Sequence, residues 1–280
     1  MNADDESAPT LAAPRGGASV AWGGVASPAA RRRFLGRVAA SIAALSVGGC
    51  DRLSQTNWFP KMLGSAETLN GRLARAVTGH EAMAQEFPPA DITPNFRSNG
   101  TAVPDNPRYA ALAANGFRDY ALEVTGLVAK PARFTLAELQ SMPSRTQITR
   151  HDCVEGWSAI GQWQGARLSA LLDVVQPARS ARFVVFHCAD PMEEGRTAPY
   201  YESIGMDDAY HVQTILAYAL NGAPLPIKNG APIRLRVERQ LGYKHAKYVM
   251  RLELVESFVN IRGGQGGYWE DQGYQWYAGI

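Results

Sequence analysis

The stretch Arg150-His151-Asp152-Cys153-Val154-Glu155-Gly156-Trp157-Ser158 places one cysteine among charged, polar and aromatic residues in the middle of the chain. The alternation leading into it is typical of a β-strand, so His151, Cys153 and Glu155 are expected on one face, because strand side chains alternate. A thiol on a polar face near Arg150 and His151 favours the thiolate, which attacks electrophiles or binds metal. Gly156-Trp157-Ser158 is expected to turn out of the strand. The alternative is a buried, inert core cysteine.

The composition bounds the class of protein. The 280 residues carry 28 basic and 26 acidic side chains, a balance that gives no reason to expect a nucleic-acid partner. Cys50, Cys153 and Cys188 make no disulfide framework, and neither CxxC nor HExxH spacing occurs to indicate zinc. The sequence also lacks the GxGxxG and GxxxxGK[ST] patterns, so a Rossmann or P-loop nucleotide site is not expected.

The first 50 residues have the pattern of an export region. Residues 1–30 are rich in Ala, Gly, Ser and Pro and are expected to be disordered. Arg31-Arg32-Arg33-Phe34-Leu35 then precedes an apolar run, Val38 to Val47, that is too short to span a bilayer and is typical of a signal. The arginine pattern is of the twin-arginine type, which exports folded proteins. The alternative is a chance basic cluster before an apolar stretch.

A lipid attachment site is a further expectation at the end of this run. Val47-Gly48-Gly49-Cys50 resembles a lipoprotein processing site, and a lipid on Cys50 would tether the mature protein to a membrane surface. The alternative is cleavage nearby without lipid. We therefore expect a periplasmic protein in which residues 1–50 form the export region. The motifs described below place a functional domain over 94–280, which leaves 51–93 as an N-terminal extension.

The body of the chain predicts strands interleaved with short helices. The expected strands are Tyr120–Val128, Ala181–Cys188, Ile233–Val237 and Tyr248–Val255. The expected helices are 61–86, Leu136–Ser141, Ser169–Val175 and Ile215–Leu220, the last ended by Asn221-Gly222. Thr135 and Glu138 form a capping-box pattern at the start of the second of these. Because strands and helices do not alternate regularly, the predicted fold class is α+β with mixed β-sheets and short helices.

A second polar cluster lies in the C-terminal third. It consists of Asn229-Gly230-Ala231-Pro232-Ile233-Arg234 and Gly242-Tyr243-Lys244-His245-Ala246-Lys247. Two basic segments beside a glycine turn supply guanidinium, ammonium and backbone N–H donors suited to a phosphate. From these residues alone, a solvated basic loop remains the alternative.

These motifs together resemble the sulfite oxidase family, which includes the periplasmic methionine-sulfoxide reductases. The Cys-Val-Glu-x-Trp-Ser core at Cys153, preceded by Arg150 and followed by Trp163 and Gly165, is similar to the family's molybdenum-binding segment. The family's cysteine is a direct ligand of the molybdenum, and thiolate ligation suits a redox metal. The resemblance therefore implies a sulfite-oxidase-type domain over 94–280, with molybdopterin (Mo) as cofactor and Cys153 as metal ligand.

The resemblance also implies a set of pterin and phosphate contacts. The Asn-Gly-x-Pro-x-Arg and Gly-Tyr-Lys-x-x-Lys elements occur in the family in this order, and the positions they imply are Asn229, Arg234, His245, Ala246 and Lys247. Cys188 stands where a further pterin contact is expected, often Thr in the sulfoxide reductases. A buried core position is the alternative for Cys188.

Two outer segments complete the resemblance. Asn95-Phe96-Arg97-Ser98-Asn99-Gly100-Thr101 is similar to the N-terminal cofactor segment, which implies contacts by Asn95, Arg97 and Ser98. Asn99 stands where sulfite oxidases have a histidine, so Arg97 is left to face substrate, cofactor phosphate or solvent. Trp269-x-x-x-x-Tyr274 resembles the segment with the active-site tyrosine. Aromatic packing is the alternative for Tyr274.

The expected function is that of a molybdenum-cofactor-dependent oxidoreductase with Arg150, Arg97 and Tyr274 as pocket groups beside Cys153. It would transfer an oxygen atom from a small S- or N-oxide such as methionine sulfoxide. The alternatives are sulfite oxidation, a non-catalytic molybdopterin-binding protein, and a thiol hydrolase that pairs Cys153 with His151 or His211. The resemblance implies a membrane haem protein as electron-transfer partner. Because the chain lacks the immunoglobulin-like dimerisation domain of larger members, we expect a monomer.

Overall fold

The computed structural model describes residues 81–191 and 199–280, together with isolated positions between 56 and 79. These long ranges belong to the second of the chain's two units, Thr68–Ile280. The predicted export region 1–50 and most of the helix expected over 61–86 lie outside the described residues. In the described part of the chain, no helix has both the length and the apolar character that a membrane span requires.

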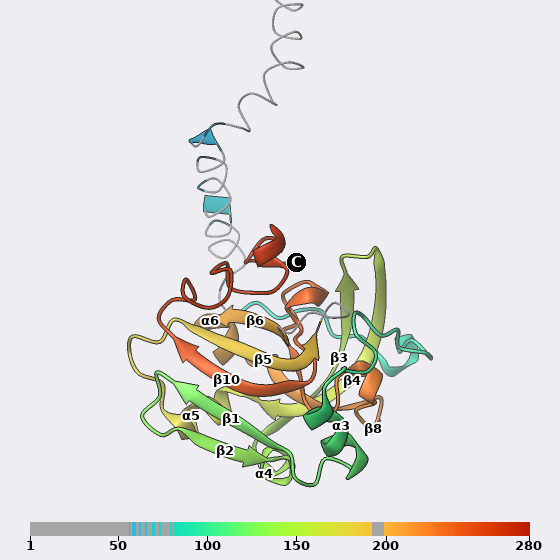
Figure 1. Ribbon diagram of the computed structural model, residues 1–280. Helices are drawn as coiled ribbons and strands as arrows, with labels where there is room; N and C mark the ends of the chain where they lie inside the picture. Colours follow the sequence, from blue (N-terminus) through green and yellow to red (C-terminus); the bar gives the residue numbers. More distant parts are fainter. Residues whose placement is uncertain are drawn as a thin grey trace, which may run out of the picture. The chain divides into compact units, whose positions relative to one another are not determined.

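Two five-stranded sheets form the framework of the described residues (Figure 1). The first contains, in spatial order, β2 (Ala132–Thr135), β1 (Ala121–Gly126), β10 (Val249–Val255), β5 (Phe183–Pro191) and β6 (Pro199–Gly205). The second contains β3 (Ser144–Cys153), β4 (Trp157–Arg167), β7 (Ile215–Leu220) and β8 (Ala223–Pro224), with β9 (Arg234–Arg236) paired to β7. Since β1 and β10 pair parallel and their other neighbours pair antiparallel, the predicted α+β fold with mixed sheets is confirmed.

Short helices and turns connect these strands. The helices are α3 (Pro107–Ala114), α4 (Leu136–Ser141), α5 (Leu168–Val175) and α6 (Met206–Tyr210). The 3-10 turns are η1 (Pro89–Asp91), η2 (Ile227–Asn229), η3 (Gly242–Lys244) and η4 (Glu270–Gln272). The predicted capping box of α4 is present, because Thr135 Oγ1 accepts from the Glu138 N–H at 3.2 Å while the Glu138 carboxylate accepts from the Thr135 N–H at 2.7 Å.

The main core lies against the first sheet. The inner side chains of β1, β5 and β10 pack with the buried face of α5, where Leu168, Leu171, Leu172 and Val175 recur at helical spacing. A second cluster surrounds the fully buried Trp163 of β4, and its ring meets Phe96 edge to face with centroids 5.0 Å apart. The first sheet is thus a packed support, and the second sheet carries the cysteine.

The predicted helix over Ile215–Leu220 is wrong, since these residues form strand β7. The segment is buried between neighbours on both sides, because β7 pairs with β4 and β9. A short apolar run of this kind suits a central strand as well as a buried helix, and only its pairing partners decide between them. The predicted Asn221-Gly222 stop is correct as a chain reversal, since both residues have positive φ.

The β3–β4 hairpin sets the position of the cysteine. Its two strands pair from Ser144 opposite Ala166 to Cys153 opposite Trp157, so Cys153 is the last paired residue before the turn. At the other end, a Cβ on Gly165 would lie 2.3 Å from the Leu216 carbonyl oxygen, so only glycine allows β4 to approach β7 this closely. Figure 1 shows the hairpin as the longest pair of strands, reaching past the edge of the first sheet.

Candidate active site

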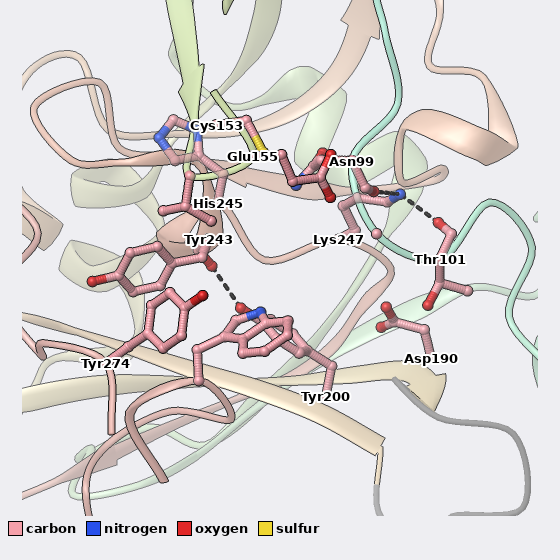
Figure 2. A pocket seen from close by; sticks show the side chains of 13 residues that line it. Asn99, Thr101, Cys153, Glu155, Asp190, Tyr200, Tyr243, His245, Lys247 and Tyr274 are labelled. Carbon is pink, nitrogen blue, oxygen red and sulfur yellow. Dashed lines mark hydrogen bonds between the residues drawn. The ribbon is translucent and has the colours of Figure 1, made fainter. Parts of the chain in front are cut away.

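A cavity of about 140 Å³ lies beside the β3–β4 turn (Figure 2). It is enclosed by segments far apart in sequence. Its lining residues are Asn99, Gly100, Thr101, Cys153, Val154, Glu155, Asp190, Tyr200, Tyr243, His245, Lys247, Trp269 and Tyr274. The cavity therefore brings together the cysteine segment, the N-terminal cofactor segment, the Gly-Tyr-Lys-x-x-Lys element and the C-terminal aromatic segment that the sequence singled out.

Cys153 opens onto this cavity as a free, half-buried thiol. Burial raises the pKa of the Cys153 thiol, and the Glu155 carboxylate adds to the effect, while the Glu155 and Val154 N–H groups and the Arg97 charge oppose it. Metal ligation requires the thiolate, so the proton must leave when a metal binds. A half-buried thiol facing a cavity fits a metal ligand better than an inert core residue.

The two basic neighbours do not activate Cys153 as the sequence suggested. Arg150 is exposed and its Nε lies 2.9 Å from Asp152 Oδ1, and both residues line a different cavity. His151 is buried, and burial followed by the charges of Arg236, Arg234 and Lys247 lowers its pKa well below the usual range, so the ring is neutral. The strand alternation explains the difference, because Arg150 and Cys153 point to opposite sides of β3. The structure therefore does not bring Arg150 into the pocket at Cys153.

Lys247 is the cation on the cavity wall. Its Nζ donates to the backbone oxygens of Asn99 at 2.7 Å, Thr101 at 2.5 Å and Lys228 at 2.8 Å. Burial and the nearby Arg234 charge lower the pKa of Lys247 to about 7, with Asp190 opposing the shift. Figure 2 shows the ammonium group between the Asn99 and Thr101 segments, beside the open space.

Arg234 is a second cation close to this wall, in the interior. It is fully buried and donates to the carbonyl oxygens of Asn229 at 3.0 Å and His245 at 3.2 Å. Burial, and then the charge of Arg236, lowers the pKa of Arg234 to about 9. Within the described ranges, no carboxylate forms an ion pair with Arg234 or Lys247. An anion at this place would supply the missing negative charge.

Buried polar atoms without a partner gather in the same region. They include Asn99 Oδ1, Asn229 Nδ2, Arg234 Nε and His245 Nδ1. Buried polar groups are nearly always hydrogen-bonded, so a cluster of exceptions indicates a missing ligand. The charges of Arg234 and Lys247 suit a phosphate group, and the unpartnered donor and acceptor atoms suit a ring system that forms hydrogen bonds. The residues present therefore fit a molybdopterin cofactor with its metal toward Cys153.

The remaining predicted contacts of the N-terminal segment lie at the rim. Asn95 and Arg97 are exposed, and the Arg97 guanidinium stacks 5.0 Å above the Trp157 ring with an amino nitrogen 3.8 Å from Glu155 Oε2. Ser98 donates its hydroxyl to the Lys228 carbonyl and accepts from Lys247 Nζ at 3.3 Å. Ser98 thus supports the cationic wall, whereas Asn95 does not line the cavity.

Three further predicted residues fall into different places. Cys188 belongs to the main core and is 5% exposed, so the structure favours the core alternative for it over a cofactor contact. Ala246 is buried, and its carbonyl accepts from the Leu235 N–H at 2.8 Å. Tyr274 lines the cavity and remains 42% exposed, with its ring centroid 5.4 Å from that of Tyr243.

Several residues that line the cavity were not predicted as site residues from the sequence. Asp190 is buried at the end of β5 and burial raises its pKa to about 7. Tyr200 lies on β6 and Trp269 precedes η4, where its ring packs 5.2 Å from Tyr274. The position of Asp190, two residues after a predicted buried strand, was an available signal. The placement of Tyr200 depends on sheet pairing and had no such signal.

The family of this chain follows from its similarity to known proteins. Residues 110–259 match the family described as "Oxidoreductase molybdopterin binding domain". The chain belongs to the sulfite oxidase family of molybdopterin-binding oxidoreductases. It is 40% identical over 197 residues to a putative protein-methionine-sulfoxide reductase subunit YedZ1 from Azospira oryzae, covering 70% of this chain and 68% of that protein.

Other members of this family are also similar to the chain. The protein-methionine-sulfoxide reductase catalytic subunit MsrP from Xanthomonas campestris pv. campestris is 33% identical over 237 residues, covering 81% of this chain and 70% of that protein. A crystal structure of the sulfane dehydrogenase SoxCD from Paracoccus pantotrophus aligns with a TM-score of 0.47 at 25% identity, over 52% of this chain and 40% of that chain.

Family membership settles the class of chemistry. This sulfite oxidase family member is an enzyme, a molybdopterin-dependent oxidoreductase whose cofactor carries molybdenum. The thiol-hydrolase alternative is therefore replaced by redox chemistry. The structure supports the same conclusion, because burial and the charge of Arg236, whose Nη1 lies 2.9 Å from His151 Nδ1, lower the pKa of His151 well below its usual range and make it a weak base.

Proposed function

We propose that this enzyme reduces a neutral S-oxide of the methionine sulfoxide class by oxygen-atom transfer. The observation that carries the proposal is the charge beside the cysteine. Glu155 lines the cavity next to Cys153, and the arginine nearest to them, Arg97, lies 3.8 Å from that carboxylate. A sulfite anion approaching Cys153 would be repelled by the Glu155 carboxylate, and the Arg97 guanidinium that could attract it is already paired with Glu155. A neutral sulfoxide is not repelled in this way.

The opposite side of the cavity supports the same substrate class. Tyr243, Trp269 and Tyr274 present aromatic rings to the open space, with adjacent centroids 5.2–5.4 Å apart. An apolar wall suits the alkyl groups of a thioether, and sulfur contacts with aromatic rings are favourable by about 0.3–1.5 kcal/mol. Figure 2 shows Tyr274 and Tyr243 together on this side, facing Cys153 across the cavity.

The residues have separate tasks in this proposal. The bound cofactor supplies the two-electron oxygen-atom chemistry, and the protein supplies orientation and electrostatics. Cys153 ligates the metal, while Lys247 and Arg234 hold the anionic end of the cofactor. Tyr274 directs its hydroxyl to the oxide oxygen of the substrate. The aromatic wall orients the sulfur and excludes water from it.

The printed names of two relatives support this substrate class, since both are described as methionine-sulfoxide reductase subunits. Sulfite oxidation is the second candidate, and the observation in its favour is Arg97, an exposed cation at the rim. In that case Arg97 would leave Glu155 and bind the substrate anion.

The test is a substrate comparison on metal-loaded protein with reduced viologen. We expect dye consumption with methionine sulfoxide and poor electron donation by sulfite. Arg97→Ala should change the sulfoxide rate little, because a neutral oxygen gains less from a guanidinium than an anion does. Arg179→Ala, an exposed arginine in the loop before β5, is the matched control. Efficient sulfite oxidation that collapses in Arg97→Ala alone would reverse the assignment.

The cellular setting of the proposal rests on the sequence. We propose that a membrane haem protein delivers the electrons, that the twin-arginine segment at Arg31–Arg33 directs export to the periplasm, and that Cys50 is the lipid attachment site. Intact-mass measurement of the exported protein checks the last two points. A mature chain beginning at Cys50 with a lipid mass is expected. A chain that keeps residues 1–30 after export would contradict processing and lipid attachment at Cys50, and a full-length chain found only in the cytoplasm would contradict the export proposal.

A further inference from the structure

A buried ion cluster lies behind the aromatic wall of the cavity, and the proposed chemistry does not yet use it. Lys244 Nζ of η3 lies 2.5 Å from Glu202 Oε1 of β6 and 2.5 Å from Glu270 Oε1 of η4. The three side chains are 0–1% exposed. Two carboxylates around one ammonium group would leave a net negative charge inside the protein, which is unfavourable unless a proton neutralises it.

The geometry of the two carboxyl groups indicates that this proton is present. Glu202 Oε1 and Glu270 Oε1 both contact the same Lys244 ammonium group, so the two carboxyl groups lie side by side in the interior, where two like charges favour sharing one proton. Burial raises the pKa of Glu202 well above its usual range, with Glu270 adding to the shift and Lys244 opposing it. Conversely, the two carboxylates outweigh the effect of burial on Lys244 and raise its pKa. Lys244 therefore stays charged, and Glu202 carries the proton of the pair.

Tyr200 connects the pair to the cavity. Its hydroxyl oxygen lies 3.4 Å from Glu202 Oε2, and the hydroxyl donates to the Tyr243 carbonyl at 2.6 Å (Figure 2). Tyr200 also lines the cavity. The groups that face this hydroxyl are Glu202, Glu270, and Asp190 and Cys188 of β5, and together with burial they raise the pKa of Tyr200 well above its usual range. The hydroxyl is therefore neutral, and once its O–H turns from the Tyr243 carbonyl toward the cavity it can donate that proton while it accepts another from Glu202.

We propose that the Glu202–Glu270 pair stores a proton and passes it through the Tyr200 hydroxyl into the cavity when the oxide is reduced. This inference rests on the proposed function. Reduction of a sulfoxide breaks the S–O bond and forms two O–H bonds, so that R₂SO + 2 e⁻ + 2 H⁺ gives R₂S + H₂O. The electrons come from a reduced haem protein or viologen dye. One proton comes from the pair and the other from water, which also reprotonates the pair because an unneutralised charge there is unfavourable.

The stored proton is tested first without turnover. A protonated carboxyl group has an infrared C=O band distinct from that of a carboxylate, and the band shifts in D₂O. The purified wild-type protein should show this band near neutral pH, with a contribution from Asp190, whose pKa is about 7. Glu202→Gln and Glu270→Gln should each remove the part of the band that Asp190 does not supply, because the remaining carboxylate then pairs with Lys244 alone. A spectrum in which both variants keep the wild-type band would overturn the stored proton, whatever the enzyme's substrate.

The relay is tested by the pH profile of turnover with reduced viologen and methionine sulfoxide. In wild type the pair keeps its proton between about pH 6 and 8, so kcat there should change only as far as Asp190 and Lys247, which line the cavity with pKa values of about 7, titrate. In Tyr200→Phe and Glu202→Gln, kcat should fall about tenfold per pH unit over that range, because bulk water must then supply the proton. A purely structural effect would lower kcat equally at every pH.

Tyr201→Phe is the matched control. Tyr201 is the next residue on β6, and its hydroxyl lies 2.6 Å from Asp271 Oδ2, not on the cavity. Its pH profile should match that of wild type, and molybdenum content should be equal in all variants. Parallel profiles for wild type, Tyr200→Phe and Tyr201→Phe would overturn the relay. A wild-type enzyme without sulfoxide activity would overturn the proposed function, while the infrared band would still decide whether the pair holds a proton.

Discussion

Removal of the Lys247 ammonium group should weaken cofactor binding in a measurable way. The substitution Lys247→Met keeps the aliphatic stem and removes the charge that lies on the cavity wall. A charge-assisted hydrogen bond to an anion contributes about 1.5–3 kcal/mol. At about 1.4 kcal/mol per factor of ten, the cofactor should dissociate roughly 10- to 150-fold more readily.

The same ammonium group also ties the Asn99 and Thr101 carbonyls to that of Lys228, so its loss costs stability even without cofactor. The informative quantity is therefore the difference in melting temperature between loaded and cofactor-free protein. A loss of 1.5–3 kcal/mol of binding should narrow this difference by roughly 3–12 °C for a domain of this size. Subtracting the cofactor-free value removes the structural contribution from the comparison.

The assay is thermal unfolding of both forms, together with molybdenum content after gel filtration. Lys228→Ala is the control, because its side chain is exposed and its carbonyl, which accepts from Lys247, is retained. Arg234→Met should act in the same direction as Lys247→Met. If both variants keep the wild-type molybdenum content and the full melting-temperature difference, the anion binds elsewhere and the account of this wall is refuted.

Three further predictions follow from individual contacts. Thr135→Ala removes the cap of α4 and should lower the free energy of unfolding by about 0.5–2 kcal/mol without changing activity; unchanged denaturant midpoints would contradict it. Cys188→Ala should cost about 1–2 kcal/mol of stability and leave molybdenum content unchanged, whereas lost molybdenum would restore Cys188 as a cofactor contact. Burial, and then nearby charges, lowers the pKa of His245 in the folded protein. Below about pH 6.5, His245 is therefore protonated in the unfolded chain but stays neutral in the folded, cofactor-free protein. As the pH is lowered below about 6.5, this residue should reduce the free energy of unfolding by up to about 1.4 kcal/mol per pH unit. His245→Gln should make the dependence of the unfolding free energy on pH less steep by that amount. Equal slopes in wild type and His245→Gln would show that His245 titrates normally.

Local patterns predicted much of the fold. The capping box at Thr135, the helix over 168–175 and the strands around 183–191 and 249–255 depend on neighbouring residues, and the structure has each of them. The prediction of a helix over Ile215–Leu220 was wrong because a six-residue apolar run has neither a helical nor a strand period of its own. Its state is decided by pairing with β4 and β9, which no local pattern shows.

The candidate site likewise contains residues that sequence motifs predict and residues that only the fold brings to the cavity. Cys153, Lys247 and His245 were found because they belong to motifs, and the fold brings all three to one cavity. Arg150 was selected for its closeness in sequence, but strand alternation directs it to the other side of β3. Tyr200 reaches the cavity through the pairing of β6 with β5, a contact between segments that sequence spacing cannot relate.

The most direct test of the central claim is molybdenum analysis of the purified protein beside its Cys153→Ser variant. Protein from a molybdenum-competent host should contain about one molybdenum per chain, and Cys153→Ser should lose turnover because a serine hydroxyl is a poor substitute for a soft thiolate ligand. We expect turnover to rise and fall with the molybdenum content. Full activity in a metal-free preparation, or undiminished activity in Cys153→Ser, would contradict it.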